Sequence, residues 1–140
     1  MSKSTDGGCE AAAGHSESGV VRMSLPSVFL RLESLAVAVA ATALYIDGDY
    51  AIWPLLAFLV APDLSFAAYL AGPRVGAVGY NLAHTYVLPI ALAAGCLLSG
   101  EAGLPVQIAL IWSAHIGIDR FFGYGLKYPT AFKDTHLGRV

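Results

Sequence analysis

Charged side chains are scarce in this chain. Asp, Glu, Lys and Arg make up 13% of its 140 residues, whereas 56% are hydrophobic; an ordinary soluble domain has about 25% charged residues. A water-soluble fold of this size could not bury so much apolar surface. The formal net charge is only −2, and no cluster of Lys and Arg resembles a phosphate-binding stripe. We therefore exclude nucleic acid as a partner and expect membrane lipids instead.

Cysteine is also rare, with two residues in the chain. Cys9 lies in a polar stretch and Cys96 within an apolar run, so a disulfide between them is not expected. Residues 1–24 are rich in Gly, Ser and Ala, with scattered charge and no apolar period. Such a segment cannot offset the entropy of ordering. We predict a disordered polar N-terminal tail over residues 1–24.

Four apolar stretches follow this tail, at about residues 28–46, 51–70, 75–99 and 104–122. Each approaches the ~20 residues that a helix needs to cross a hydrocarbon core. Their apolar residues show no period of two, which favours helices over a barrel. The breaks between them are short, so sequential helices should be antiparallel neighbours. The sequence predicts an all-α integral membrane bundle of four transmembrane helices over residues 28–124, arranged antiparallel, up-down-up-down.

The basic residues indicate the orientation. All eight lie before the first span or at its start, in the second loop, or at the end of the last span or beyond it: Lys3, Arg22, Arg31, Arg74, Arg120, Lys127, Lys133 and Arg139. The positive-inside rule places these regions in the cytoplasm. We expect a multi-pass protein of the inner (plasma) membrane, with both termini cytoplasmic and residues 125–140 as a C-terminal tail. In an alternative reading the first span is a cleaved signal, although Glu33 lies where a basic segment should be.

Ionisable groups within membrane spans are costly and usually functional. Several polar residues interrupt the predicted spans, and six of them are considered for a site: Glu33, Asp63, Asn81, His84, His115 and Asp119. Counted from the cytoplasmic end of each span at 1.5 Å per residue, all six lie roughly 6–14 Å deep. We therefore expect one polar layer in the cytoplasmic half of the membrane. Glu33 can instead form an interfacial ion pair with Arg31.

The spacing within the helices predicts that several of these side chains share a face. His115 and Asp119 are four residues apart, and Asn81 and His84 are three apart. Two imidazoles and two carboxylates suit a divalent metal ion such as zinc or manganese. We therefore predict metal ligands at Asp63, His84, His115 and Asp119, with Asp63 and Asp119 also catalytic. The Gly72/Gly76 and Gly79/Ala83 pairs would permit close helix contacts, including those of a homo-oligomer.

Three functions remain open from these residues. A metal-bound water would support hydrolysis of a lipid-like or phosphorylated substrate at the cytoplasmic leaflet. The layer could instead be a polar network that sets helix packing in a non-enzymatic structural or transport-related subunit. His84 and His115 could also ligate a haem iron. For single residues, Asp63 could cap the half-helix after Pro62, and Asp134 and His136 could reach the site from the terminal segment.

Five strings carry a resemblance to a known family: APDLS (61–65), YLAGPRVG (69–76), YNLAHTY (80–86), HIGIDR (115–120) and GYGLKYP (123–129). They resemble the small bacterial membrane proteins of domain of unknown function 4260, over about residues 30–139. This resemblance implies a membrane fold and no particular activity. The chain is also loosely similar to membrane-bound metal-dependent hydrolases in Pro62-Asp63, His84-Thr85 and His115 with Asp119. It lacks the His-Arg pair that those enzymes carry before the His-Thr.

Overall fold

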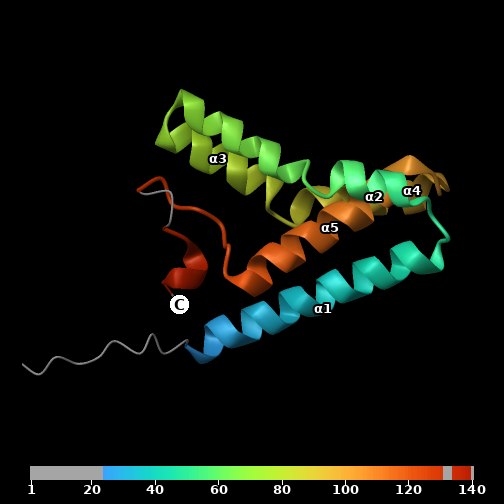
Figure 1. Ribbon diagram of the computed structural model, residues 1–140, viewed down its shortest axis with the longest axis horizontal. Helices are drawn as coiled ribbons and strands as arrows, with labels where there is room; N and C mark the ends of the chain where they lie inside the picture. Colours follow the sequence, from blue (N-terminus) through green and yellow to red (C-terminus); the bar gives the residue numbers. More distant parts are fainter. Residues whose placement is uncertain (1–23, 131–133, 140) are drawn as a thin grey trace, which may run out of the picture.

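A computed structural model of the protein describes residues 24–130 and 134–139. The described chain is helical and has no strand, as expected; an isolated antiparallel bridge joins Lys127 to Thr135. The helices are α1 (Leu25–Asp47), α2 (Ile52–Phe58), the 3-10 helix η1 (Pro62–Ala71), α3 (Pro73–Ala83), α4 (Val87–Ser99), α5 (Leu104–Phe122) and the short 3-10 helix η2 (His136–Gly138) (Figure 1). The tail predicted for residues 1–24 lies outside the described residues, apart from Ser24.

Two of the predicted spans are interrupted, which corrects the expectation of four continuous helices. The stretch 51–70 divides into α2 and η1, and the stretch 75–99 divides into α3 and α4. Proline has no amide hydrogen, and its ring clashes with the carbonyl group four residues earlier. Pro62 is four residues beyond Phe58, where α2 ends, and Pro89 is four residues beyond Thr85, in the second break. Each break is therefore explained by a proline that follows it.

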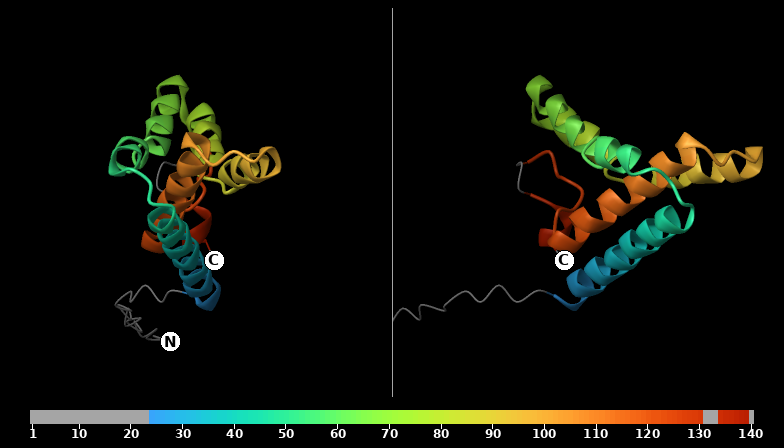
Figure 2. Two further views of the ribbon diagram at one scale, coloured as in Figure 1. Left: turned by 90° about the vertical axis from the view of Figure 1, so that its right-hand side faces the viewer. Right: turned by 45° about the vertical axis from the view of Figure 1, so that its right-hand side comes forward.

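Helix α5 is the centre of the packing. It contacts α1 most extensively, and α4 and α2 also pack against it. α1 and α5 lie side by side with opposite chain directions, whereas the η1–α3 pair diverges from them (Figures 1 and 2). Gly79 lets α3 approach η1 closely, because an added Cβ atom would lie 2.7 Å from the Ala68 Cβ atom. We considered Gly79 above for helix contacts in a homo-oligomer, but here it allows two helices of the same chain to pack closely.

Three helical stretches are long and apolar enough to cross a membrane: Leu25–Asp47, Ile52–Ala71 and Pro73–Ser99. Most of their residues are not buried within the described chain. Leu70 and Leu98, for example, are 94% and 91% exposed, as expected for helices that face lipid. The sequence led us to expect four spans, but α5 does not belong to this set. It carries the polar residues Gln107, His115 and Asp119, and α1, α2 and α4 pack against it.

Candidate metal centre

Four polar side chains meet where the two interrupted stretches face α5. Asp63 comes from the first turn of η1 and His84 from the residue that ends α3. His115 and Asp119 lie one turn apart on α5. One ligand atom from each residue lies within 4.8 Å of all the others. The structure therefore brings together the four residues singled out as metal ligands; their role as ligands stays a prediction.

The distances among these atoms are close to the spacing that ligands have around one metal ion. The two His Nε2 atoms are 3.3 Å apart. His84 Nε2 lies 3.5 Å from Asp63 Oδ1 and 3.5 Å from Asp119 Oδ2, and the corresponding distances from His115 Nε2 are 3.5 and 3.7 Å. Charge-assisted hydrogen bonds are shorter, at about 2.7–2.9 Å. A tetrahedral zinc site with bonds of about 2.1 Å has its ligand atoms about 3.4 Å apart.

The ring of His84 is held with one nitrogen toward the cluster. Its Nδ1 atom lies 2.9 Å from the backbone oxygen of Tyr80. A carbonyl oxygen only accepts hydrogen bonds, so Nδ1 carries a proton, and in the neutral imidazole Nε2 then has the free lone pair. The Tyr80 ring stacks on the imidazole with centroids 3.8 Å apart. This second contact fixes the ring plane, as outer partners of metal ligands commonly do.

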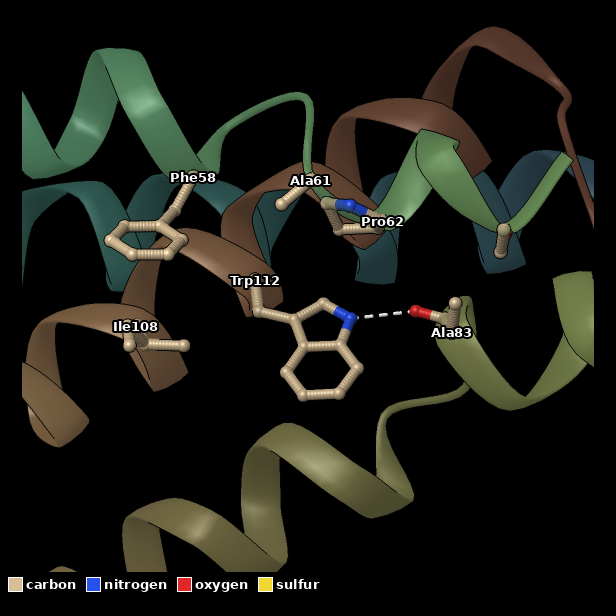
Figure 3. Close-up of a pocket in the computed structure, with 7 residues that line it drawn as sticks. Phe58, Ala61, Pro62, Ala83, Ile108 and Trp112 are labelled. Carbon is tan, nitrogen blue, oxygen red and sulfur yellow. Dashed lines mark hydrogen bonds between the residues drawn. The ribbon is translucent and has the colours of Figure 1, made fainter. Parts of the chain in front are cut away.

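The break after α3 frees backbone carbonyl groups, and α5 binds two of them. Trp112 Nε1 donates to the Ala83 oxygen at 2.6 Å (Figure 3). The guanidinium of Arg120 donates to the His84 oxygen at 3.4 Å. Non-helical backbone at membrane depth is tolerated where protein groups satisfy it or where it lines a cavity. Helix α5 thus supplies two of the four clustered side chains and also stabilises the break that positions His84.

The cluster is buried on its histidine side and open on its carboxylate side. The side chains of His84 and His115 are 3% and 8% exposed, whereas those of Asp119 and Asp63 are 23% and 43% exposed. The N-cap of η1 is Ala61 and Asp63 lies in the first turn, so Asp63 does not occupy the capping position that the sequence suggested. A ligand or solvent molecule would approach the cluster past Asp63.

The other polar residues considered above lie outside the cluster. Asn81 binds the backbone of Lys127 twice, through Nδ2 to the Lys127 oxygen (2.9 Å) and through Oδ1 to the Lys127 nitrogen (2.7 Å). Glu33 lines a separate cavity with Arg120 and His136, and Arg31 donates to the Phe121 oxygen. Asp134 pairs with Arg139. The idea that Asp134 and His136 complete the site is therefore wrong.

Lys127 is a residue near the site that sequence reasoning missed. It is 7% exposed, and its ammonium group lies 4.5 Å from the ring centroid of Tyr80 and 4.7 Å from that of Phe66. Burial lowers the pKa of Lys127, and the negative charge of Asp119 acts in the opposite direction. Because Tyr80 also stacks on His84, the lysine lies directly behind the cluster. Its only signal in the sequence is a lysine shortly after the last apolar stretch.

The C-terminal segment that carries Lys127 should detach in acid. His136 Nδ1 accepts a hydrogen bond from the Leu126 amide at 2.8 Å. Burial and then the charge of Arg120 lower the pKa of His136. The folded segment therefore prefers the neutral imidazole, and this contribution is complete above about pH 6.5, the value in the unfolded chain. It is lost as the pH falls through the lowered pKa.

We expect hydrogen exchange at the Leu126 amide, corrected for intrinsic rates, to accelerate as the pH falls below about 6. A His136→Phe variant should lack this acceleration, because it has no group to protonate. Equal protection of the wild-type amide at about pH 5 and pH 8 would contradict the assignment.

Comparison with known proteins adds a family to this geometry. The family described as Domain of unknown function (DUF4260) matches residues 27–140, which include all four clustered residues. No curated protein matches the chain, and no solved structure does. The looser similarity to metal-dependent hydrolases gains no support from these comparisons. Since the match covers well over half of the sequence, the chain belongs to the DUF4260 family.

Proposed function

We propose that the cluster binds one divalent metal ion, zinc or manganese, and that the protein uses it to hydrolyse a lipid-like substrate within the membrane. The distances among the four clustered atoms carry this proposal, in which three of the residues hold the ion and Asp63 acts beside it. Five of their separations are 3.3–3.7 Å, close to the ~3.4 Å edge of a tetrahedral site. Imidazole favours zinc, and carboxylate oxygen is also suited to manganese.

Charge balance supports the same ion. Two carboxylates and two neutral imidazoles carry a total charge of about −2, which a divalent cation cancels. Uncompensated charge at membrane depth is costly, by roughly 2.5–3.5 kcal/mol per group on insertion scales. Because the histidines are buried and the carboxylates are close to them, a metal ion turns four costly polar groups into a neutral unit.

The unequal exposure of the carboxylates supports a catalytic role. Catalytic zinc sites commonly keep three protein ligands and one position for water. His84, His115 and Asp119 are the less exposed ligands, and we assign them to the metal. Asp63, 43% exposed, is assigned as the base. It would act as general base toward a water that the ion activates for attack on the ester or phosphate, and the proton would pass to the leaving oxygen.

The geometry weighs against haem. Two imidazoles that bind one iron from opposite faces need their nitrogen atoms about 4 Å apart, twice a metal–nitrogen bond length. His84 Nε2 and His115 Nε2 are 3.3 Å apart, and two carboxylates occupy the space where the macrocycle would extend. The remaining alternative is a polar network that only sets helix packing. It requires no bound metal, so the metal content of the purified protein distinguishes it from the proposal.

Element analysis of detergent-purified protein tests the proposal. We expect about one zinc or manganese ion per chain, and its loss in the His115→Ala, Asp119→Ala double variant. Asp63→Asn should retain metal but lose hydrolysis of ester-linked or phosphate-linked lipids in mixed micelles. Metal-free wild-type protein that remains metal-free after incubation with either ion would refute the site and favour the packing network.

A further inference from the structure

A cavity of about 240 Å³ lies next to the cluster. Phe58, Ala61 and Pro62 form one wall, and Ala83, Ile108 and Trp112 form the other (Figure 3). These side chains come from α2, the break before η1, α3 and α5. The cavity approaches the lower end of the ~300–1,000 Å³ that ligand pockets commonly have. It can therefore hold part of a ligand, such as a segment of hydrocarbon chain.

Residues that line the cavity are close neighbours in the sequence of the clustered residues. Pro62 and Ala83 immediately precede Asp63 and His84, and Trp112 lies one turn before His115 on α5. The Ala83 carbonyl is already bound by the indole of Trp112. A molecule in the cavity would therefore have its near end beside the metal centre.

One polar atom in the wall of this apolar cavity has no hydrogen-bond partner among the described residues. Ser65 lines the cavity, and its Oγ atom is buried without a hydrogen bond to any described residue. A buried hydroxyl left unpaired costs about 1–3 kcal/mol. An occupant that brings a hydrogen-bond acceptor to Ser65 would remove this cost. The cavity thus fits a molecule that is mostly hydrocarbon with an acceptor at one point.

The surroundings identify the source of such a molecule. The side chains of Leu56 on α2, Val60 in the break and Leu64 on η1 are 69%, 59% and 75% exposed. This stretch, Ile52–Ala71, is one of the three that can cross a membrane. Its apolar surface would be in contact with lipid chains, so the hydrocarbon nearest to the cavity is an acyl chain.

We infer that the cavity binds the acyl chain of a membrane lipid, with the ester carbonyl oxygen accepting a hydrogen bond from Ser65. The substrate class of the metal centre is then an ester-linked lipid, held by its chain beside the ion. This inference rests on the proposed function for its catalytic meaning. Lipid binding in the cavity can be measured without metal, so the lipid site and the metal-dependent function can be refuted independently.

Tryptophan fluorescence in lipid nanodiscs tests the inference. The chain has two tryptophans, so a Trp53→Phe background leaves Trp112 as the reporter. We expect lipids brominated in the acyl chain to quench Trp112 saturably at low mole fraction. Ala83→Leu should fill the cavity and abolish this quenching, whereas Ala91→Leu, at an exposed position of α4, should leave it unchanged. Equal quenching with Ala83→Leu would overturn the inference.

A second variant tests the inference even if Ala83→Leu fails to fold. Ester-linked lipid should bind about fivefold more tightly than its ether-linked analogue, the effect of one neutral hydrogen bond. Ser65→Ala should remove this preference while retaining the quenching itself. No preference for the ester in the parent protein would overturn the assignment of Ser65. Metal content, measured on the same samples, reports independently on the proposed function.

Discussion

Replacing His84 with alanine is expected to abolish tight metal binding and to remove the stability that the metal supplies. His84 is the most buried member of the cluster, and its ring is held by Tyr80 on two sides. Loss of an outer partner of a metal ligand costs about 10–100-fold in affinity, so loss of the ligand itself should cost more. At a metal concentration 1,000 times the Kd, binding adds about 4 kcal/mol to the free energy of unfolding.

Chemical unfolding in detergent, with excess metal or with a chelator, measures this effect. The wild-type protein should lose about 4 kcal/mol on chelation under those conditions, and the His84→Ala variant should lose none. His136→Ala is the matched control, because this histidine also binds the backbone but lies outside the cluster. If wild-type stability does not respond to the chelator, the cluster is a packing network and His84→Ala reports only the loss of its contacts.

The positions of the clustered side chains could be anticipated from the sequence because depth in a membrane follows from residue count. Asp63, His84, His115 and Asp119 have similar predicted depths when residues are counted along straight helices, and their ligand atoms do converge. The direction in which a side chain points is harder to derive. Glu33 has a similar predicted depth, but it lies at an exposed position on the long helix α1. No partner in the local sequence fixes its direction.

The break at His84 and the place of Lys127 depend on interactions that a local pattern does not contain. The break is explained by Pro89, because the proline ring clashes with the backbone carbonyl group four residues earlier. Lys127 is positioned by two hydrogen bonds between its backbone and the Asn81 side chain, 46 residues away in the chain. Asn81 was considered for the polar layer, but its amide instead binds the backbone of a segment that the sequence suggested was a surface tail.

The contact between α1 and α5 leads to a second large effect, at Gly117. A Cβ atom added there would lie 2.5 Å from the Ser34 backbone oxygen and 2.9 Å from the Ala38 Cβ atom. The Ser34 oxygen belongs to the helix backbone and cannot move away cheaply. We therefore expect Gly117→Ala to force the helices apart and to lower the free energy of unfolding by about 1–3 kcal/mol. Because His115 and Asp119 flank Gly117 on α5, metal affinity should fall as well.

Gly95 provides the opposite control on α4, because an added Cβ atom there meets nothing within 4 Å. Alanine is favoured over glycine within helices by up to about 1 kcal/mol, so Gly95→Ala should stabilise the protein slightly. Thermal unfolding of both variants, followed by circular dichroism in detergent, should therefore show shifts of opposite sign. Equal small shifts would mean that α1 and α5 do not approach as closely as the clash at Gly117 requires. The packing of α1 against α5 would then be too weak to hold His115 and Asp119 at the distances observed in the cluster.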